Sequence, residues 1–478
     1  MPLRRLCHRG TRTGLALATM VIVGTISSPV AASTPPRPVP STPVFSLRRL
    51  PAFVSGTVAD QRLAVALKPV MDATGGPADK ACLSVRDPDG RVAFARNPTT
   101  PLIPASTMKL QTATAALARL GGDFRFTTQV RAAGPVTNAT VAGDIWLVGS
   151  GDPLLATADF AAVAGYQGQP RLATSMEALA DRVVAAGVRS IGGRVVGDES
   201  RYDTTRYLPS WSPTYATDAE IGPQSALTVN DGFAAFRPRA VPAPAPASNA
   251  AALLTTLLRA RGVTVGTDAG EGGAPGGSST VAAVESSPLR DVVGVMLQES
   301  DNLAAELLVK ELGTRFAGAG TTAAGTAVVR ATLASMGLGG AGMAAVDGSG
   351  LDRSDRLTCD LLQATLARNG QGSELGRDLP VAGRNGTLAR RFRGTPAAGK
   401  VAAKTGSLKG VTGLAGWTTT LDGRALQFAL LANDLSSDGV GAGLEDRVVS
   451  ALAGWPQAPS AADIGPRPLM AAATVAPG

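Results

Sequence analysis

The sequence predicts an α+β fold, in which a segment with a different residue pattern interrupts the order of helices and strands. Apolar alternation typical of strands occurs at 81–97 and at 412–432. Helical patterns occur at 105–120 and 287–312. From about 125 to 284 the chain instead shows short Val-rich runs separated by turns, which indicates one or more inserted lobes. The chain has 478 residues, and single cores stop growing at roughly 250–300 residues, so more than one domain is expected.

Both strand regions contain a turn signal. In the first, the apolar runs at 82–85 and 92–94 flank the turn sequence DPDG at 87–90. In the second, 412–420 and 425–432 are joined by LDGR, whose Asp-Gly pair favours a hairpin. Antiparallel strand pairs are therefore expected in both regions.

Three helices are predicted from their ends. The first runs from 105 to 120 and stops at a Gly-Gly pair. The second starts at Ser287 and Pro288, which suit the N-cap and the first helical position, and runs to residue 297. The third spans 303–312, after a break. Within the central segment, 242–251 is of low complexity and 270–279 is expected to be poorly ordered.

The first 32 residues have the features of an export signal. Four arginines precede an apolar run from about Leu15 to Ile26, and Val30-Ala31-Ala32 forms a small-residue cleavage site. The alternative is an uncleaved membrane anchor, because the stretch is nearly long enough to span a bilayer. Cleavage is favoured, since Gly, Ser, Thr and Pro dilute the apolar run. The mature protein then begins near Ser33 with a Pro-rich leader, 33–54, and is extracytoplasmic.

Loss of this signal limits the chemistry that the chain can support. The only histidine, His8, is lost with it, so a Ser-His-Asp triad and a His-ligated metal site are excluded. No metal or other cofactor is expected. The loss of four arginines lowers the formal net charge from +8 to +4, which suits residence beside an anionic cell wall. Nucleic acid is not expected as a partner, because aromatic residues make up only 4% of the chain and no basic cluster alternates with them.

Two cysteines remain after the signal, Cys82 and Cys359. In an oxidising compartment they would form a disulfide, but two buried free thiols fit the sequence about equally well. The sequence leaves both alternatives open.

Ser106 and Lys109 lie three positions apart at the start of the first predicted helix, so their side chains share one face. This spacing places a base beside a nucleophile, and the helix N-terminus would favour negative charge there. The chain has 38 arginines and seven lysines, and only a lysine with a pKa lowered by burial can accept the serine proton. The alternative is an ordinary helix start with a snorkelling lysine.

Ser300-Asp301-Asn302 lies at the break between the second and third predicted helices. Ser300 would relay a proton between Lys109 and a leaving group. Asn302 would bind substrate or steady Lys109, and Asp301 would face away and hold the loop. Taken alone, the segment is also an ordinary capping turn.

Lys404-Thr405-Gly406-Ser407 lies in a predicted strand. Lys404 and the hydroxyls of Thr405 and Ser407 would bind a substrate carboxylate, and Gly406 would let a substrate backbone approach closely. An exposed edge lysine is the alternative for this segment alone. The joint occurrence of the three segments, in this order, favours the functional interpretation.

These three segments resemble the active-site signature of penicillin-binding proteins and serine β-lactamases. Longer sequence segments around and between these motifs resemble those of one family in that group. It is the D-alanyl-D-alanine carboxypeptidase/endopeptidase family of type-4, low-molecular-mass penicillin-binding proteins. The longer segments lie at 101–109, 143–147 with 151–153, 347–351 and 386–388. The resemblance covers roughly 55–455. The 194 positions between Ser106 and Ser300 match the long insert of this family, whereas class A β-lactamases place these motifs much closer together.

The resemblance implies a β-lactamase/transpeptidase-like domain, with a helical cluster and a five-stranded antiparallel sheet. This domain would comprise 55–125 and 285–456, interrupted by inserted β-rich domain(s) at 126–284 and followed by a flexible tail, 457–478.

The resemblance also implies roles for the site residues. Ser106 would be the acylated nucleophile and Lys109 the general base, with Ser300 and Asn302 completing the proton network. Lys404 and Thr405 would bind the terminal carboxylate of the substrate. The backbone N–H groups of Ser106 and Ser407 would form the oxyanion hole, with Gly406 between the binding residues.

The expected function is that of a secreted serine D-Ala-D-Ala carboxypeptidase, with endopeptidase activity as an extension. It would cleave peptidoglycan stem peptides and be inhibited by β-lactam antibiotics. One alternative is a serine β-lactamase, which needs a group that activates water for deacylation; the motif spacing argues against it. The other is a non-catalytic peptidoglycan-binding or β-lactam-sensing protein, against which the intact Lys109 and Lys404 argue.

Overall fold

The computed structural model describes residues 42–340 and 342–467. The expected export signal, 1–32, lies outside the described residues, as do the first part of the leader and the end of the tail. The described residues divide into two units, one of 42–50 with 465–467 and one of Pro51–Ile464. Among the described residues, every helix is too short or too polar to serve as a membrane span.

The ends of the described chain contain more helix than the sequence predicts. A 3₁₀ turn, Leu47–Arg49, lies in the predicted extended leader, and helix α1 (Pro51–Asp72) begins before the expected end of that leader at residue 54. Proline is favourable at a first helical position, because the N–H that it lacks has no helical partner there. The short helix α13 (Ala461–Ile464) lies in the predicted flexible tail.

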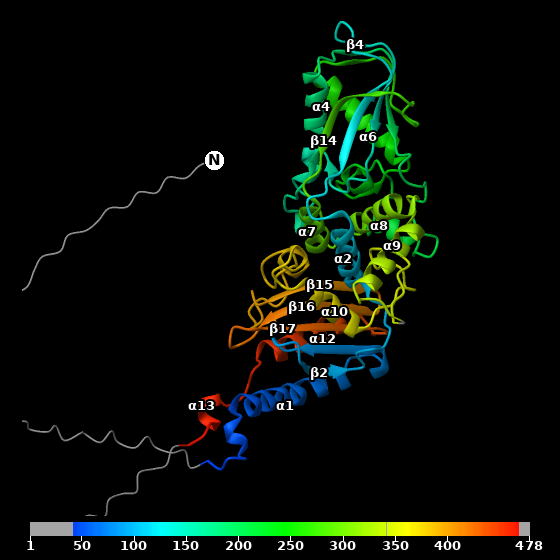
Figure 1. Cartoon of the computed structure of the whole chain (residues 1–478). Helices are drawn as coiled ribbons and strands as arrows, with labels where there is room; N and C mark the ends of the chain where they lie inside the picture. The colour runs from blue at the N-terminus through cyan, green and yellow to red at the C-terminus, as the bar shows by residue number, and fades with distance from the viewer. Residues whose placement is uncertain (1–41, 341, 468–478) are drawn as a thin grey trace, which may run out of the picture. The chain divides into compact units, whose positions relative to one another are not determined.

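The larger unit contains a five-stranded antiparallel sheet, as the family resemblance implies (Figure 1). Its order is β15-β16-β17-β1-β2. The bounds are β15 Val401–Leu408, β16 Val411–Thr419, β17 Ala425–Ala432, β1 Ala81–Arg86 and β2 Val92–Arg96. The register pairs Ala81 with Ala432, so the first strand of the described residues lies beside the last of them.

Helices cover both faces of this sheet. Because side chains alternate along a strand, Phe428 and Leu430 of β17 pack toward α1 and α12 (Asp438–Ala453). Ala429 and Leu431 belong to the core on the opposite face, with α2 (Lys109–Leu120) and α10 (Cys359–Asn369). Cys82 and Cys359 form a disulfide there, which resolves the alternative that the sequence leaves open.

Further helices surround α2 and share its apolar core. They are α7 (Leu289–Glu299), α8 (Asn302–Ala317) and α9 (Thr322–Ser335), with the single turn α11 (Glu374–Arg377) beside α7. The first predicted helix is confirmed from Lys109 on, but its first turn, Ala105–Met108, is a 3₁₀ helix. In the second, Pro288 is the N-cap residue rather than the first helical residue, so Ser287 lies outside the helix.

The central segment contains its own sheet, in the order β13-β9-β5-β3-β14. Its strands are β13 Gly270–Glu271, β9 Val195–Asp198, β5 Ile145–Val148, β3 Thr127–Ala132 and β14 Ser279–Glu285. Helices α4 (Met176–Ala185) and α6 (Pro246–Arg259) pack on it. Residues 242–251, of low complexity in sequence, therefore include the start of a helix, and 270–279 includes a paired strand.

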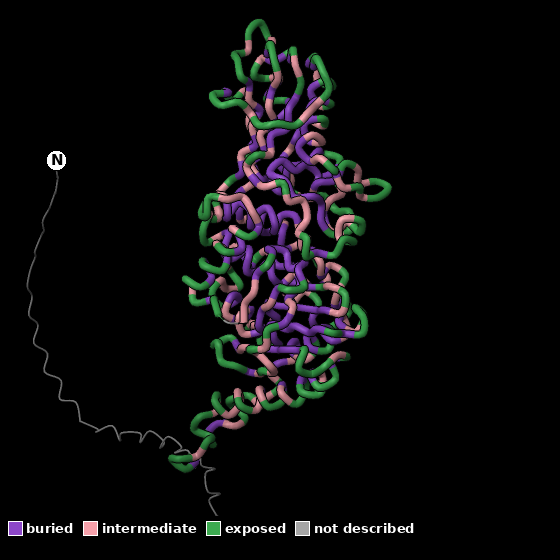
Figure 2. The backbone as a smooth tube through the Cα atoms, turned by 90° about the vertical axis from the view of Figure 1, so that its right-hand side faces the viewer, coloured by how far each residue is buried: buried purple, intermediate pink, exposed green. Residues whose placement is uncertain are grey.

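Shorter elements complete the central segment. A three-stranded sheet contains β12 Thr264–Val265, β8 Ser190–Ile191 and β4 Thr140–Val141. Two small ladders are β6 Leu155–Ala156 with β7 Thr174–Ser175, and β10 Phe233–Ala235 with β11 Val241–Pro242. The single-turn helices are α3 (Ala158–Ala161) and α5 (Thr214–Thr217). Figure 2 shows buried residues in the interior of the tube and exposed residues mainly along its outer edges.

Candidate active site

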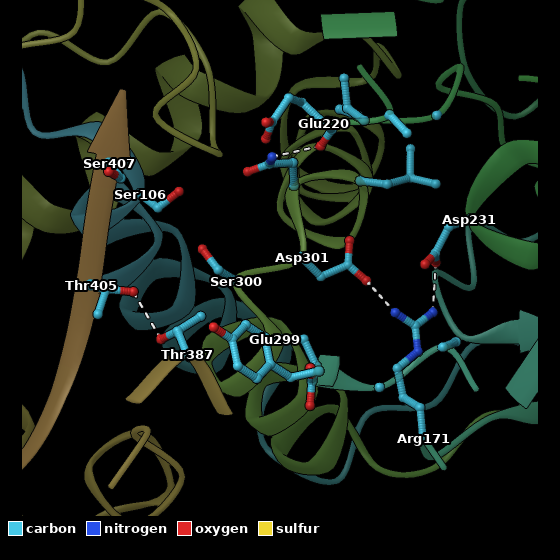
Figure 3. Close-up of a pocket in the computed structure, with 18 of the residues that line it drawn as sticks. Ser106, Arg171, Glu220, Asp231, Glu299, Ser300, Asp301, Thr387, Thr405 and Ser407 are labelled. Carbon is cyan, nitrogen blue, oxygen red and sulfur yellow. Dashed lines mark hydrogen bonds and ion pairs between the residues drawn. The ribbon is translucent and has the colours of Figure 1, made fainter. Parts of the chain in front are cut away.

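The fold brings the three sequence segments together around one cavity of about 620 Å³. Ser106 comes from the turn before α2, Ser300 and Asn302 from the junction of α7 and α8, and β15 supplies the third segment. The central segment closes another side of the cavity (Figure 3). The lining includes Ser106, Tyr166, Arg171, Glu220, Asp231, Glu299, Ser300, Asn302, Thr387, Arg391, Thr405 and Ser407.

Ser106 lies in the 3₁₀ turn that precedes α2. Ala105 is buried with a positive φ of 46°, an unusual conformation for a residue with a Cβ atom. The first N–H groups of a helix have no partner within it. The local backbone therefore presents the Ser106 hydroxyl to the cavity at a helix N-terminus.

The ammonium of Lys109 contacts three oxygen atoms that carry no formal charge. Its Nζ donates to Ser106 Oγ at 2.9 Å, to Asn302 Oδ1 at 2.6 Å and to the backbone oxygen of Ser349 at 2.8 Å. The side chain is fully buried. Burial disfavours the charged form and lowers the pKa of Lys109 to about 8, against the attraction of Asp347 and Glu306. A large fraction of this lysine is thus neutral near pH 8 and able to accept a proton.

The loop that contains Ser349 is held by buried carboxylates. Glu306 of α8 accepts hydrogen bonds from the N–H groups of Gly348 and Ser349, at 2.9 and 2.8 Å. Asp347 accepts from Gly350 N–H at 2.7 Å. A Cβ atom on Gly350, whose φ is +84°, would lie 1.9 Å from the Ala105 oxygen, so a side chain there would displace the turn before Ser106. The loop therefore supports both members of the Ser106–Lys109 pair.

Ser300 and Asn302 diverge from a tight turn between two helices. Ser300 ends α7 in the left-handed conformation, and its Oγ accepts from Lys404 Nζ at 2.8 Å. Asn302 places its amide oxygen on Lys109 and donates from Nδ2 to the Glu220 carbonyl at 2.7 Å. The expectation that Asn302 steadies Lys109 is thus consistent with the geometry, whereas the lysine in contact with Ser300 is Lys404.

Asp301 holds this turn, as expected, but it also lines the cavity instead of facing away from it. Its Oδ1 accepts from the N–H of Ala304 at 2.9 Å and so caps α8. Its Oδ2 accepts from Arg171 at 3.1 Å. Both carboxylate oxygens are therefore engaged.

Strand β15 borders the cavity with alternate residues. Lys404 is buried. Burial is the main cause that lowers its pKa well below the ordinary value, and repulsion from Lys109 adds to it. Thr405 Oγ1 donates to Thr387 Oγ1 at 2.8 Å, and Thr405 and Ser407 face the cavity (Figure 3). A Cβ atom on Gly406 would lie 2.7 Å from the Pro104 oxygen, so glycine allows the strand to approach the Ser106 turn.

Sequence reasoning missed four contributors to this site. The Ser349 carbonyl and Thr387 lie in phrases that carry the family resemblance, but those phrases gave no role for either residue. Arg171 and Glu220 belong to the central segment and carry no motif. Among the described residues, no cluster of three or more acidic, histidine or cysteine side chains is arranged to hold a metal ion.

Comparisons with known proteins identify similar chains. A family model described as the D-Ala-D-Ala carboxypeptidase 3 (S13) family matches residues 77–244 and 235–454. The chain is 32% identical over 426 residues to a D-alanyl-D-alanine carboxypeptidase of Actinomadura sp. (strain R39), covering 72% of this chain and 76% of that one. It is 33% identical over 353 residues to Carboxypeptidase DacB of Mycolicibacterium smegmatis, with coverages of 71% and 73%.

The fold has solved counterparts at lower identity. The structure of penicillin binding protein 4 (dacB) from Haemophilus influenzae aligns with a TM-score of 0.68 and 21% identity, covering 82% of this chain and 99% of that one. A predatory endopeptidase from Bdellovibrio bacteriovorus aligns with a TM-score of 0.52 and 19% identity, with coverages of 79% and 94%. These alignments support the transpeptidase-like fold.

Proposed function

This chain belongs to the D-Ala-D-Ala carboxypeptidase 3 (S13) family of serine peptidases, and from that premise we propose that it releases terminal D-alanine from peptidoglycan stem peptides through an acyl-enzyme on Ser106. The observation that carries the proposal is the contact of Ser106 Oγ with Lys109 Nζ at 2.9 Å. The lowered pKa of Lys109 supports a role as base.

In the acylation step, Ser106 Oγ attacks the carbonyl carbon of the penultimate D-alanine while its proton passes to Lys109 Nζ. The backbone N–H groups of Ser106 and Ser407 stabilise the oxyanion that forms. The C–N bond then breaks, and the departing D-alanine amine takes a proton through the Ser300 hydroxyl. Ser300 regains a proton from Lys404, which it contacts, and Lys404 takes up the proton that Lys109 received from Ser106, so that Lys109 is neutral again before deacylation.

Deacylation reverses these roles. Lys109 takes a proton from water, the resulting hydroxide attacks the ester carbon, and Ser106 Oγ recovers a proton as it leaves. Thr405 and Ser407 border the cavity where the terminal carboxylate would bind, with the charge of Lys404 behind them.

We extend the proposal to inhibitors, substrates and location. β-Lactams would acylate Ser106 as substrate mimics, and endopeptidase cleavage of cross-linked stem peptides would use the same steps with a larger leaving group. We propose that residues 1–32 direct export and are removed, and that 55–125 with 285–456 form the catalytic domain around an insert at 126–284. The protein would then act outside the cytoplasm.

Mass measurement after mixing with benzylpenicillin tests the proposal. The expected result is a persistent adduct that peptide mapping places on Ser106, together with D-alanine release from a stem peptide. Ser106→Ala removes both. Rapid loss of the adduct with hydrolysed drug would favour a β-lactamase, and the absence of any adduct would favour a non-catalytic wall-binding protein.

A further inference from the structure

A buried arginine of the central segment contacts the turn that contains Ser300 and Asn302. Arg171 follows the 3₁₀ turn Tyr166–Gly168, and its side chain is 5% exposed. Its Nη1 donates to Asp301 Oδ2 at 3.1 Å, and its Nη2 donates to Asp231 Oδ1 at 2.6 Å. Figure 3 shows the guanidinium between the two carboxylates, at the side of the cavity opposite β15.

The turn Ser300–Asn302 adopts a conformation that its own sequence does not favour. Ser300 has φ 58° and ψ 35°, in the left-handed region that residues with a Cβ atom rarely occupy. Such a conformation persists when surrounding contacts over-determine it. The Asp301 carboxylate provides contacts on two sides, since it caps α8 with one oxygen and binds Arg171 with the other.

The side chains of this turn each have a different partner. Ser300 contacts Lys404, and Asn302 contacts Lys109. Asp301 contacts Arg171. A rotation of the turn about the α8 N-terminus would therefore move Ser300 and Asn302 together, away from both lysines.

Arginine suits this position better than lysine. Its planar guanidinium presents donors in a fixed fork and stays charged when buried, so it binds Asp301 and Asp231 at once. Asp231 and Asp301 have side chains 18% and 6% exposed, and removal of Arg171 would leave two acidic groups close together with little solvent. Glu299, at the end of α7, also attracts Arg171.

We propose that Arg171 is a positioning residue for acylation, which fixes the Ser300–Asn302 turn through Asp301 and so keeps Ser300 and Asn302 in contact with the two active-site lysines. This inference rests on the proposed function of the same site. It gives the central segment a part in the chemical step, in addition to lining the cavity.

The test compares rate constants for acylation of Ser106 by benzylpenicillin at saturating drug. Arg171→Met should lower this constant roughly ten- to hundredfold, because displacement of a catalytic group by about 1 Å has effects of that size. Arg171→Lys, which keeps the charge but cannot span both carboxylates, should recover part of the rate. The apparent affinity for the drug before acylation should change by less than about threefold.

Arg201→Met is the matched control. Arg201 also joins the central segment to α8, with Nε and Nη2 on Glu311 at 2.8 and 2.7 Å. Glu311 lies nine residues after Asn302, about 13 Å along the helix. This variant should lose stability but acylate within about threefold of the wild-type rate.

A double variant separates positioning from general damage. If Arg171 acts through Asp301, then Arg171→Met combined with Asp301→Asn should be no more than about threefold slower than the slower single variant. A double variant that shows the product of the two single effects would overturn the inference, as would a wild-type rate in Arg171→Met. If Arg171→Met does not fold, the same comparison is made with Arg171→Lys. A wild-type protein that forms no adduct would instead overturn the proposed function, and this inference with it.

Discussion

The two halves of helix α8 border buried cations that have different partners. Near its N-terminus, Lys109 and Lys404 are fully buried, and among the described residues the oxygen atoms that accept hydrogen bonds from their ammonium groups carry no formal charge. In its C-terminal half, Lys310 is equally buried but donates to the Asp203 carboxylate at 2.5 Å. The same residue type thus has neutral partners near the start of α8 and a carboxylate partner in its C-terminal half.

This difference separates the environment that we propose to be catalytic from a structural one. Burial lowers the pKa of all three lysines, but for Lys310 a direct carboxylate contact opposes the effect of burial. A lysine that must exchange protons gains from neutral partners, because they accept hydrogen bonds without fixing the charge. A lysine that only holds two segments together gains from a carboxylate.

The largest expected effect on the acylation rate comes from replacing Lys109, with Lys310 as the comparison. Lys109→Met should lower the acylation rate by roughly 10²- to 10⁴-fold, the usual contribution of a general base. Lys310→Met should leave the rate within about threefold and instead change the thermal midpoint. Stopped-flow acylation and thermal unfolding of both variants measure the two effects. Equal losses of rate in the two variants would break the distinction.

The pH dependence of acylation should report the protonation of Lys109. Since Lys109 has a pKa of about 8 and acts as a base when neutral, the rate should rise with pH and level off above about 8. Below that value it should fall by about tenfold for each pH unit. Rates measured from pH 6 to 9.5 check this, and a flat profile over that range would contradict the assignment of Lys109 as base.

Asn302→Asp would convert the catalytic environment into one like that of Lys310. A carboxylate at 2.6 Å from Lys109 stabilises the ammonium and raises its pKa, so the rising limb of the pH profile should move to higher pH. A shift of one unit would reduce the rate at pH 7 by about tenfold. Asn302→Ser, which adds no charge, serves as the control, and an unshifted profile in Asn302→Asp would argue against the comparison.

The smallest effect on activity should come from Asp203→Asn. Asp203 is 31% exposed, so loss of its charge should reduce the free energy of unfolding by about 1–3 kcal/mol, less than for a fully buried pair. The acylation rate should change by less than about threefold. Urea unfolding measures the first and drug acylation the second. Unaltered stability would mean that Lys310 does not depend on its carboxylate.

The sequence was sufficient for elements whose signals are local. Strands β1, β2, β16 and β17 follow from period-two alternation with turns, and the side chains of Ser106 and Lys109 meet because three positions bring them to one helix face. Helix α6 was missed because Pro and Ala dominate its start, although its buried residues Ala247, Ala250, Leu254 and Leu258 follow helical spacing. Helix α1 was hidden by the Pro-rich stretch before it and by Pro69 inside it.

Contacts across the chain had no local signal. Arg171 is one of 38 arginines, and its partners lie 60 and 130 positions away. The third acceptor of Lys109 is a backbone oxygen, which every residue possesses, so no residue type marks Ser349 as its source. The motifs thus predicted which side chains would gather, but not the second set of groups that orients them.

The pairing of the first strand with the last also bears on how the site comes into being. Ala81 lies opposite Ala432, so the sheet closes only after nearly all of the chain is available. Contacts of such long sequence separation slow folding, because the intervening chain must lose entropy before they form. Lys404 lies in a strand of that late sheet, whereas Ser106 and Lys109 can meet within a single helical turn. We therefore expect a growing or partly folded chain to hold the proposed nucleophile while lacking the strand proposed to bind substrate, and to stay inert until folding is complete.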